Sequence, residues 1–211
     1  MKTRIALAVA LAVAACTALA QDTSVLRPPK GAKVAIIAFE DLQCPDCADA
    51  EPLLQEAAAT YKVAIVRHDF PLYQHAWAFE AHVFAAYLDT RSPALGEEFR
   101  RWVYENQKSI NRANLRGMAE RFADEHKITL PEKLDPTGKL AARVQADYQL
   151  GQELNIQHTP TLYVVSETQR SEPFIEGADR GQLFEVIEQM KKHAESAPPK
   201  PAPKPSAKKS N

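Results

Sequence analysis

The residues best suited to chemistry are two cysteines, Cys44 and Cys47, which lie three positions apart. A thiolate attacks disulfides, and two thiols at this spacing can close into one themselves. An apolar run of strand length at residues 33–39 precedes them, and apolar residues at helical spacing follow over residues 48–59. We therefore predict that the pair lies at the start of a helix that follows a buried strand.

The start of a helix favours a thiolate, because its unpaired N–H groups and its dipole stabilise negative charge. Cys44 is expected at the exposed mouth as the attacking thiol, and Cys47, nearly one turn further in, as the shielded thiol that resolves a mixed disulfide. Pro45 suits the first turn, where its missing N–H costs nothing. Asp46 should raise the pKa of Cys44 relative to a histidine in its place, which predicts a milder oxidant.

Two other uses of a CxxC pair are a zinc site and a structural staple. Zinc needs two more ligands, and the six histidines are scattered without a second paired motif. A loop this short adds little stability as a staple. The sequence also has no GxGxxG or GxxxxGK run. We therefore expect redox chemistry with no metal and no bound cofactor.

The N-terminal segment is typical of a signal peptide over residues 1–20. Met1–Arg4 is cationic, an uncharged apolar run follows, and a small-x-small site ends at Ala20. In an alternative, Val13–Cys16 resembles a lipobox, so that the signal would end before Cys16 and this cysteine would carry a lipid. Both interpretations predict an extracytoplasmic, periplasmic protein.

The C-terminal residues 197–211 hold five of the 15 prolines, four lysines and no large apolar side chain. We expect a disordered Pro/Lys-rich tail there and one folded domain over residues 22–195. The chain has a net charge of −1, but six positive charges lie in its two ends, which leaves −7 for residues 5–196. So acidic a body predicts no nucleic-acid partner.

The elements expected in the body indicate an α/β fold. A strand, a helix and a second strand at the start imply a parallel pair with the helix packed on it. Two late strands close in sequence add an antiparallel hairpin, so the sheet should be mixed. The expected elements after the first helix are a strand at 63–66, a helical block at 76–126 with breaks at Ser92-Pro93 and 109–112, a helix from Asp135-Pro136 to Leu154, strands at 161–165 and 172–175, and a helix at 182–192.

Three segments carry a family resemblance: Phe39–Cys47, Arg67–Leu72 and His158–Tyr163. Together they resemble the DsbA-like thioredoxin-fold family of extracytoplasmic thiol–disulfide oxidoreductases. The resemblance implies a thioredoxin-like fold with a mixed central sheet. It also implies a helical insertion between the second and third strands, at about residues 74–154.

The resemblance further implies that Thr159–Pro160 forms a cis peptide bond facing Cys44 and Cys47. A proline lowers the cost of a cis bond to about 0.5–1 kcal/mol. The N–H and C=O groups of Thr159 would then be free to pair with an extended client segment, whose cysteine would lie over Cys44. Thr159 and Pro160 are therefore the expected substrate-binding residues. The alternative is a trans proline that merely starts a strand.

The activity that the resemblance implies is a protein-disulfide oxidoreductase that acts as an oxidase on exported cysteine-containing proteins. A membrane redox partner would renew its disulfide. Two alternatives stay open: a reductase, an isomerase or a donor of reductant to one maturation partner, and a non-catalytic module that binds a metal or a partner through the same thiols.

The chain departs from the family at Ala38, where relatives carry a buried acid that helps to move the proton of the second thiol. Glu40 and Asp41 are close by, and either one could substitute through water. We expect them instead to be solvated loop acids. His75 is expected to cap or pack at the start of the next helix rather than to tune charge near the thiols.

Overall fold

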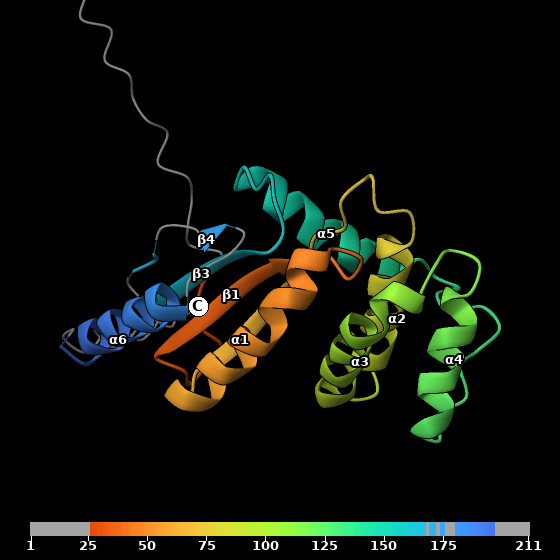
Figure 1. The fold of residues 1–211 in the computed structure, drawn as a ribbon, viewed down its shortest axis with the longest axis horizontal. Coiled ribbons are helices and arrows are strands. Elements are labelled where there is room, and N and C mark those ends of the chain that lie inside the picture. The colour runs from red at the N-terminus through yellow and green to blue at the C-terminus, as the bar shows by residue number, and fades with distance from the viewer. Residues whose placement is uncertain (1–25, 168, 172–173, 176–179, 197–211) are drawn as a thin grey trace, which may run out of the picture.

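The structure is a computed structural model that describes residues 26–167, 169–171, 174–175 and 180–196. The expected signal segment with Cys16 and the expected tail lie outside these residues. Within them, four strands form one sheet in the order β2-β1-β3-β4 (Figure 1). The strands are β1 (Val34–Glu40), β2 (Ala64–Asp69), β3 (Thr161–Ser166) and β4 (Phe174–Ile175).

Strand β1 runs parallel to β2 and antiparallel to β3, and β3 is antiparallel to β4. The mixed sheet, the strand–helix–strand unit and the late hairpin are therefore confirmed. None of the helices in the described part of the chain combines the length and the apolar character that a membrane span requires. The helices are α1 (Pro45–Tyr61), α2 (Ala78–Asp89), α3 (Pro93–Asn106), the 3₁₀ turn η2 (Gln107–Ser109), α4 (Leu115–Glu125), α5 (Lys139–Glu153) and α6 (Arg180–Ser196).

The sheet is buried on both faces, because the apolar side chains of β1 alternate between two cores. Even-numbered residues pack with Leu54 of α1 and Leu183 of α6. Odd-numbered residues pack with Phe70 and with Tyr148 of α5. This arrangement explains why β1 is a continuous apolar run rather than an alternating one.

Helices α2 to α5 form the predicted insertion between β2 and β3. In Figure 1, α2, α3 and α4 gather at the end of the molecule away from α6. They enclose a third core around Phe84, Phe99 and Phe122. Cys44 and Cys47 belong to this core, so the dithiol lies where the sheet meets the helical group.

Helix α5 begins later than predicted. The sequence indicated a start at Asp135-Pro136, but the first helical residue is Lys139. Gly138 precedes it with φ 72°, a left-handed conformation that favours glycine and turns the chain into the helix. The Asp135 carboxylate still caps this end, because it accepts the N–H of Ala141 at 2.9 Å.

Candidate active site

The two thiols lie at the junction of β1 and α1. Cys44 has an extended backbone at the N-cap of α1, and Pro45 occupies the first helical position. The Cys44 N–H donates to the carbonyl of Asp41 at 3.0 Å, which closes the turn between strand and helix. Neither Cys44 nor Cys47 is in a disulfide, so the structure represents the reduced dithiol.

Cys47 has 0% of its surface exposed. Burial raises the pKa of its thiol well above the ordinary value, and the neighbouring Cys44 and the charge of Glu40 raise it further. The N–H of Asp41 contacts its sulfur at 3.4 Å. Cys47 therefore stays protonated at neutral pH, in the position expected for a resolving thiol.

Cys44 is only 4% exposed, whereas we expected it at an exposed mouth. The difference arises because it packs in the same core as Trp77 and its sulfur lies 3.2 Å from the carbonyl of Thr159. Hydrogen bonding with Cys47 lowers the pKa of Cys44 to about 6 against the opposing effect of burial. The Thr159 side chain and the N–H groups of Cys47 and Asp46 add to this lowering. Cys44 is therefore largely a thiolate at neutral pH.

The Thr159–Pro160 peptide bond is cis, as the resemblance implied, and Thr159 lies against Cys44. The Thr159 hydroxyl is buried and has no hydrogen-bond partner within the described residues. A protonated Cys44 donates to the Thr159 carbonyl, but an ionised Cys44 can accept from the hydroxyl instead. Thr159 can thus stabilise the thiolate.

Asp46 affects Cys44 through its backbone N–H. Its side chain is exposed, where water and salt screen the negative charge, and its N–H helps to lower the pKa of Cys44. The predicted difference from a histidine at this position stays a prediction.

The expectation that Glu40 and Asp41 are solvated is wrong, since their exposed fractions are 3% and 0%. Asp41 is buried because it organises the loop around it. Its carboxylate accepts the N–H groups of Gln43 and Leu72, both at 2.6 Å, and lies 2.7 Å from Nδ1 of His75. His75 is therefore tied to the loop of the thiols.

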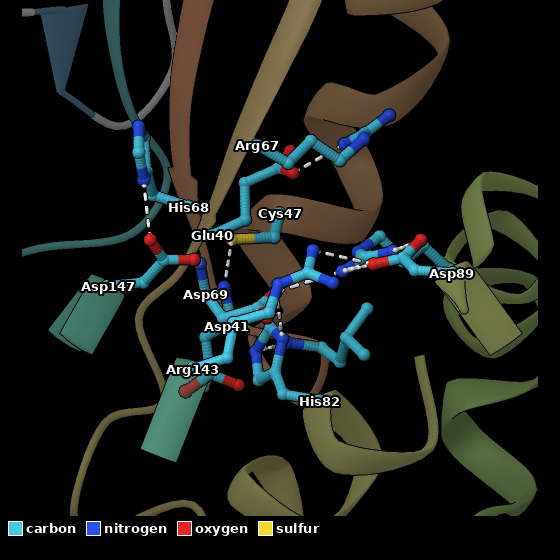
Figure 2. A network of polar contacts seen from close by, with 12 residues as sticks. Glu40, Asp41, Cys47, Arg67, His68, Asp69, His82, Asp89, Arg143 and Asp147 are labelled. Carbon is cyan, nitrogen blue, oxygen red and sulfur yellow. Dashed lines mark hydrogen bonds and ion pairs between the residues drawn. The ribbon is translucent and has the colours of Figure 1, made fainter. Parts of the chain in front are cut away.

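Glu40 is buried beside Cys47 in an ion-pair network centred on Arg67 of β2 (Figure 2). Arg67 pairs with Glu40, with Glu51 at 2.9 Å and with Glu97 at 2.8 Å. Burial would lower the pKa of Arg67, but these carboxylates raise it overall. The second carboxylate oxygen of Glu40 is buried with no partner in the described part of the chain. A buried acid thus faces Cys47, although it lies two residues beyond Ala38.

Two residues that hold the dithiol loop had no clear signal in the sequence. Gln107 donates to the carbonyls of Leu42 and Cys44, both at 3.0 Å, and His82 lies 3.2 Å from the N–H of Leu42. Both come from the helical insertion, so no local spacing connects them to the cysteines. The one hint was a histidine within a helix, α2, that is mostly apolar.

The site can perform thiol–disulfide exchange, because it pairs a thiolate with a shielded, protonated thiol. Within the residues that the structure describes, no group of three or more His, Cys, Asp or Glu side chains could hold a metal ion.

Comparisons with known proteins identify the family and the fold. The family model described as "Thioredoxin" matches residues 22–180. The chain is similar to alpha-DsbA1 of Wolbachia pipientis, with 16% identity, coverage of 81% of this chain and 96% of that chain, and a TM-score of 0.65. It is similar to ScsC of Proteus mirabilis in a transitional conformation, with 19% identity, coverage of 77% and 70%, and a TM-score of 0.61. A third similar structure is the thiol-disulfide exchange protein alpha-DsbA2 of Wolbachia pipientis, with 15% identity, coverage of 78% and 85%, and a TM-score of 0.61. No match was found among curated proteins.

Proposed function

Because the chain belongs to the thioredoxin family and has the DsbA-like form of its fold, we propose that it is an extracytoplasmic oxidoreductase that passes a disulfide to exported proteins. The observation that carries this proposal is the opposite behaviour of two adjacent thiols. The pKa of Cys44 is lowered to about 6, and that of Cys47 is raised well above its ordinary value. In such a pair, one sulfur is suited to act as nucleophile and as leaving group, and the other is suited to hold a proton.

In the proposed reaction, a client thiolate attacks Cys44 Sγ in the disulfide form, and Cys47 leaves and takes up a proton. The second client thiolate then attacks the client sulfur of the mixed disulfide, and Cys44 leaves as a thiolate. The client loses two electrons and gains a disulfide, while the Cys44–Cys47 pair is reduced. A low pKa makes Cys44 a good leaving group in the second step.

We propose that Glu40 exchanges the proton of Cys47. Cys47 has no exposed surface, so water cannot reach it directly. Glu40 is the carboxylate whose charge acts on Cys47, and one of its oxygens is unpartnered within the described residues.

We propose that a client segment pairs with the backbone beside Pro160. The Thr159 carbonyl lies 3.2 Å from Cys44 Sγ, so a strand that pairs there would bring its own cysteine within reach of Cys44.

An extracytoplasmic location is proposed on the signal-like composition of residues 1–20. The net reaction needs a two-electron acceptor to re-form the disulfide, and we propose a membrane redox partner for this step.

Reactivation of a reduced, unfolded disulfide-containing protein tests the proposal. The wild-type chain should restore the client catalytically, and Cys44→Ser should abolish turnover. Cys47→Ser should trap a mixed disulfide with the client, because the resolving thiol is missing. A wild-type protein without turnover, or a Cys47→Ser variant that yields no adduct, would contradict the assignment.

The direction of exchange can be measured against a glutathione buffer. A pKa of about 6 for Cys44 lies between the values of thioredoxin, roughly 7, and DsbA, roughly 3.5. We therefore expect a potential between about −270 and about −120 mV, which suits a mild oxidant. A potential at or below about −270 mV would favour a reductase or a reductant donor instead.

A further inference from the structure

A buried histidine connects the dithiol loop to a charged network that the proposed chemistry does not use (Figure 2). His82 of α2 is 1% exposed. Its Nε2 lies 3.2 Å from the N–H of Leu42, and its Nδ1 lies 2.8 Å from a carboxylate oxygen of Asp69. Leu42 is two residues before Cys44, in the turn between β1 and α1. His82 thus contacts the backbone of the site rather than its sulfurs.

These two contacts define which nitrogen of the His82 ring carries the proton. The N–H of Leu42 can only donate, so Nε2 must offer a lone pair. A neutral ring then carries its proton on Nδ1 and donates it to Asp69. Burial would raise the pKa of Asp69, but its contacts with His82 and Arg100 lower it overall. Asp69 is therefore an anion that orients the ring.

Asp69 is itself held by a network that crosses the helical insertion. Arg100 of α3 lies 3.2 Å from Asp69 and 3.1 Å from Asp89 at the end of α2. Arg143 of α5 contacts Asp89 at 2.7 Å and is 48% exposed. His82 is therefore fixed directly by Asp69 of β2, which Arg100 of α3 holds in turn, and its ring cannot turn without leaving buried groups unpaired.

We propose that His82 is a positioning residue of the redox site: by accepting the N–H of Leu42, it holds the turn that places Cys44 against its hydrogen-bond donors. The turn is also held by Gln107, which donates to the carbonyls of Leu42 and Cys44, and by the Asp41 carboxylate, which accepts the N–H of Gln43, but the N–H of Leu42 is held by His82. Without the His82 contact, the Cys44 sulfur shifts relative to the N–H groups of Cys47 and Asp46. The thiolate is then stabilised less. The positioning role of His82 rests on the proposed function in one respect only, namely that the Cys44 thiolate takes part in disulfide exchange.

The test is the ionisation of Cys44 in the folded, reduced chain, followed by the ultraviolet absorbance of the thiolate against pH. His82→Leu removes the acceptor and should raise the ionisation midpoint of Cys44 by about one pH unit, the equivalent of about one hydrogen bond to the thiolate. The rate of alkylation at the wild-type midpoint should fall by about fivefold, because the thiolate fraction falls from about one half to about one eleventh. His82→Gln places an amide oxygen close to the position of Nε2, so it should keep most of the wild-type value.

A matched control is provided by His68, which forms a similar pair with Asp147 at 2.8 Å. Its ring stacks on Phe39, and it has no described hydrogen bond to the dithiol loop. His68→Leu should cost stability but leave the ionisation of Cys44 unchanged. An unshifted midpoint in His82→Leu, or an equal shift in His68→Leu, would overturn the proposal.

If His82→Leu does not fold, His82→Asn replaces it. An asparagine amide reaches the position of Nδ1 and keeps Asp69, but it loses the contact with Leu42. His82→Asn should therefore shift the midpoint while His82→Gln does not, and equal midpoints in these two variants would refute the positioning role. No client takes part in the titration, so the result is independent of whether the chain oxidises proteins.

Discussion

Cys44 and Cys47 are chemically alike, and their environments alone make them differ. The sulfur of Cys44 accepts hydrogen bonds from N–H groups in the first turn of α1. Cys47 lies among apolar side chains, and the charge of Glu40 acts on it. The sequence was sufficient to predict which thiol is further inside, because one helical turn separates them.

The two thiols should react with an alkylating reagent at very different pH. Cys44 should be modified with a midpoint near pH 6, because its pKa is lowered to about 6, and Cys47 only at strongly alkaline pH. Mass spectrometry of the reduced protein after brief labelling measures both. Two thiols that titrate together near pH 9 would contradict the site described above.

Thr159→Val should raise the pKa of Cys44 by about one unit, because it removes one hydroxyl donor to the thiolate. Thr161→Val is the matched control. Thr161 is also buried, two positions along the chain, but its hydroxyl donates to the carbonyl of His158 at 2.7 Å. Equal thiolate titrations of the two variants would show that the Thr159 hydroxyl takes no part.

The residues that the sequence identified are those that carry a local pattern. Cys44, Cys47 and the Thr159–Pro160 pair stand at positions where strands and helices meet, and the resemblance named them directly. The burial of Glu40 and Asp41 could not be predicted, since it depends on partners such as Arg67 that are distant in the sequence.

At the scale of elements, periodicity was enough to predict the strands and most helix ends. Ser92 and Pro93 show why: the Ser92 hydroxyl accepts the N–H of Leu95 at 3.1 Å and the proline starts α3. The start of α5 was mispredicted, because the conformation of Gly138 lets Asp135 cap the helix from further away than an N-cap residue does.

Two helical glycines should respond oppositely to alanine. A Cβ at Gly151 in α5 would lie 2.4 Å from the ring of Phe70, so Gly151→Ala should destabilise the fold by about 1–3 kcal/mol. A Cβ at Gly117 in α4 meets nothing within 4 Å, so Gly117→Ala should stabilise it by about 0.5–1 kcal/mol. Urea unfolding measures both, and a Gly151→Ala variant that is not destabilised would mean that α5 does not pack against Phe70 as closely as described.

At the scale of the whole molecule, the thiolate makes the stability of the reduced form depend on pH. A lowered pKa in the folded state stabilises the fold fully above the unfolded value of 9.0 and loses this effect as the pH falls through about 6. Reduced wild-type protein should therefore gain stability over Cys44→Ser between pH 6 and pH 9, as followed by urea unfolding. A difference that does not vary with pH would disprove the linkage.

The dithiol shares its core with α2, α3 and α4 rather than with the faces of the sheet. The helices that would surround a docked client under the proposed function are therefore the same ones that keep water from Cys47. We expect that client choice and reduction potential cannot be altered independently in such an arrangement. A hybrid that kept the strands and the cysteine turn but took its helical segment from another protein would therefore contain the same two cysteines and have a different reduction potential.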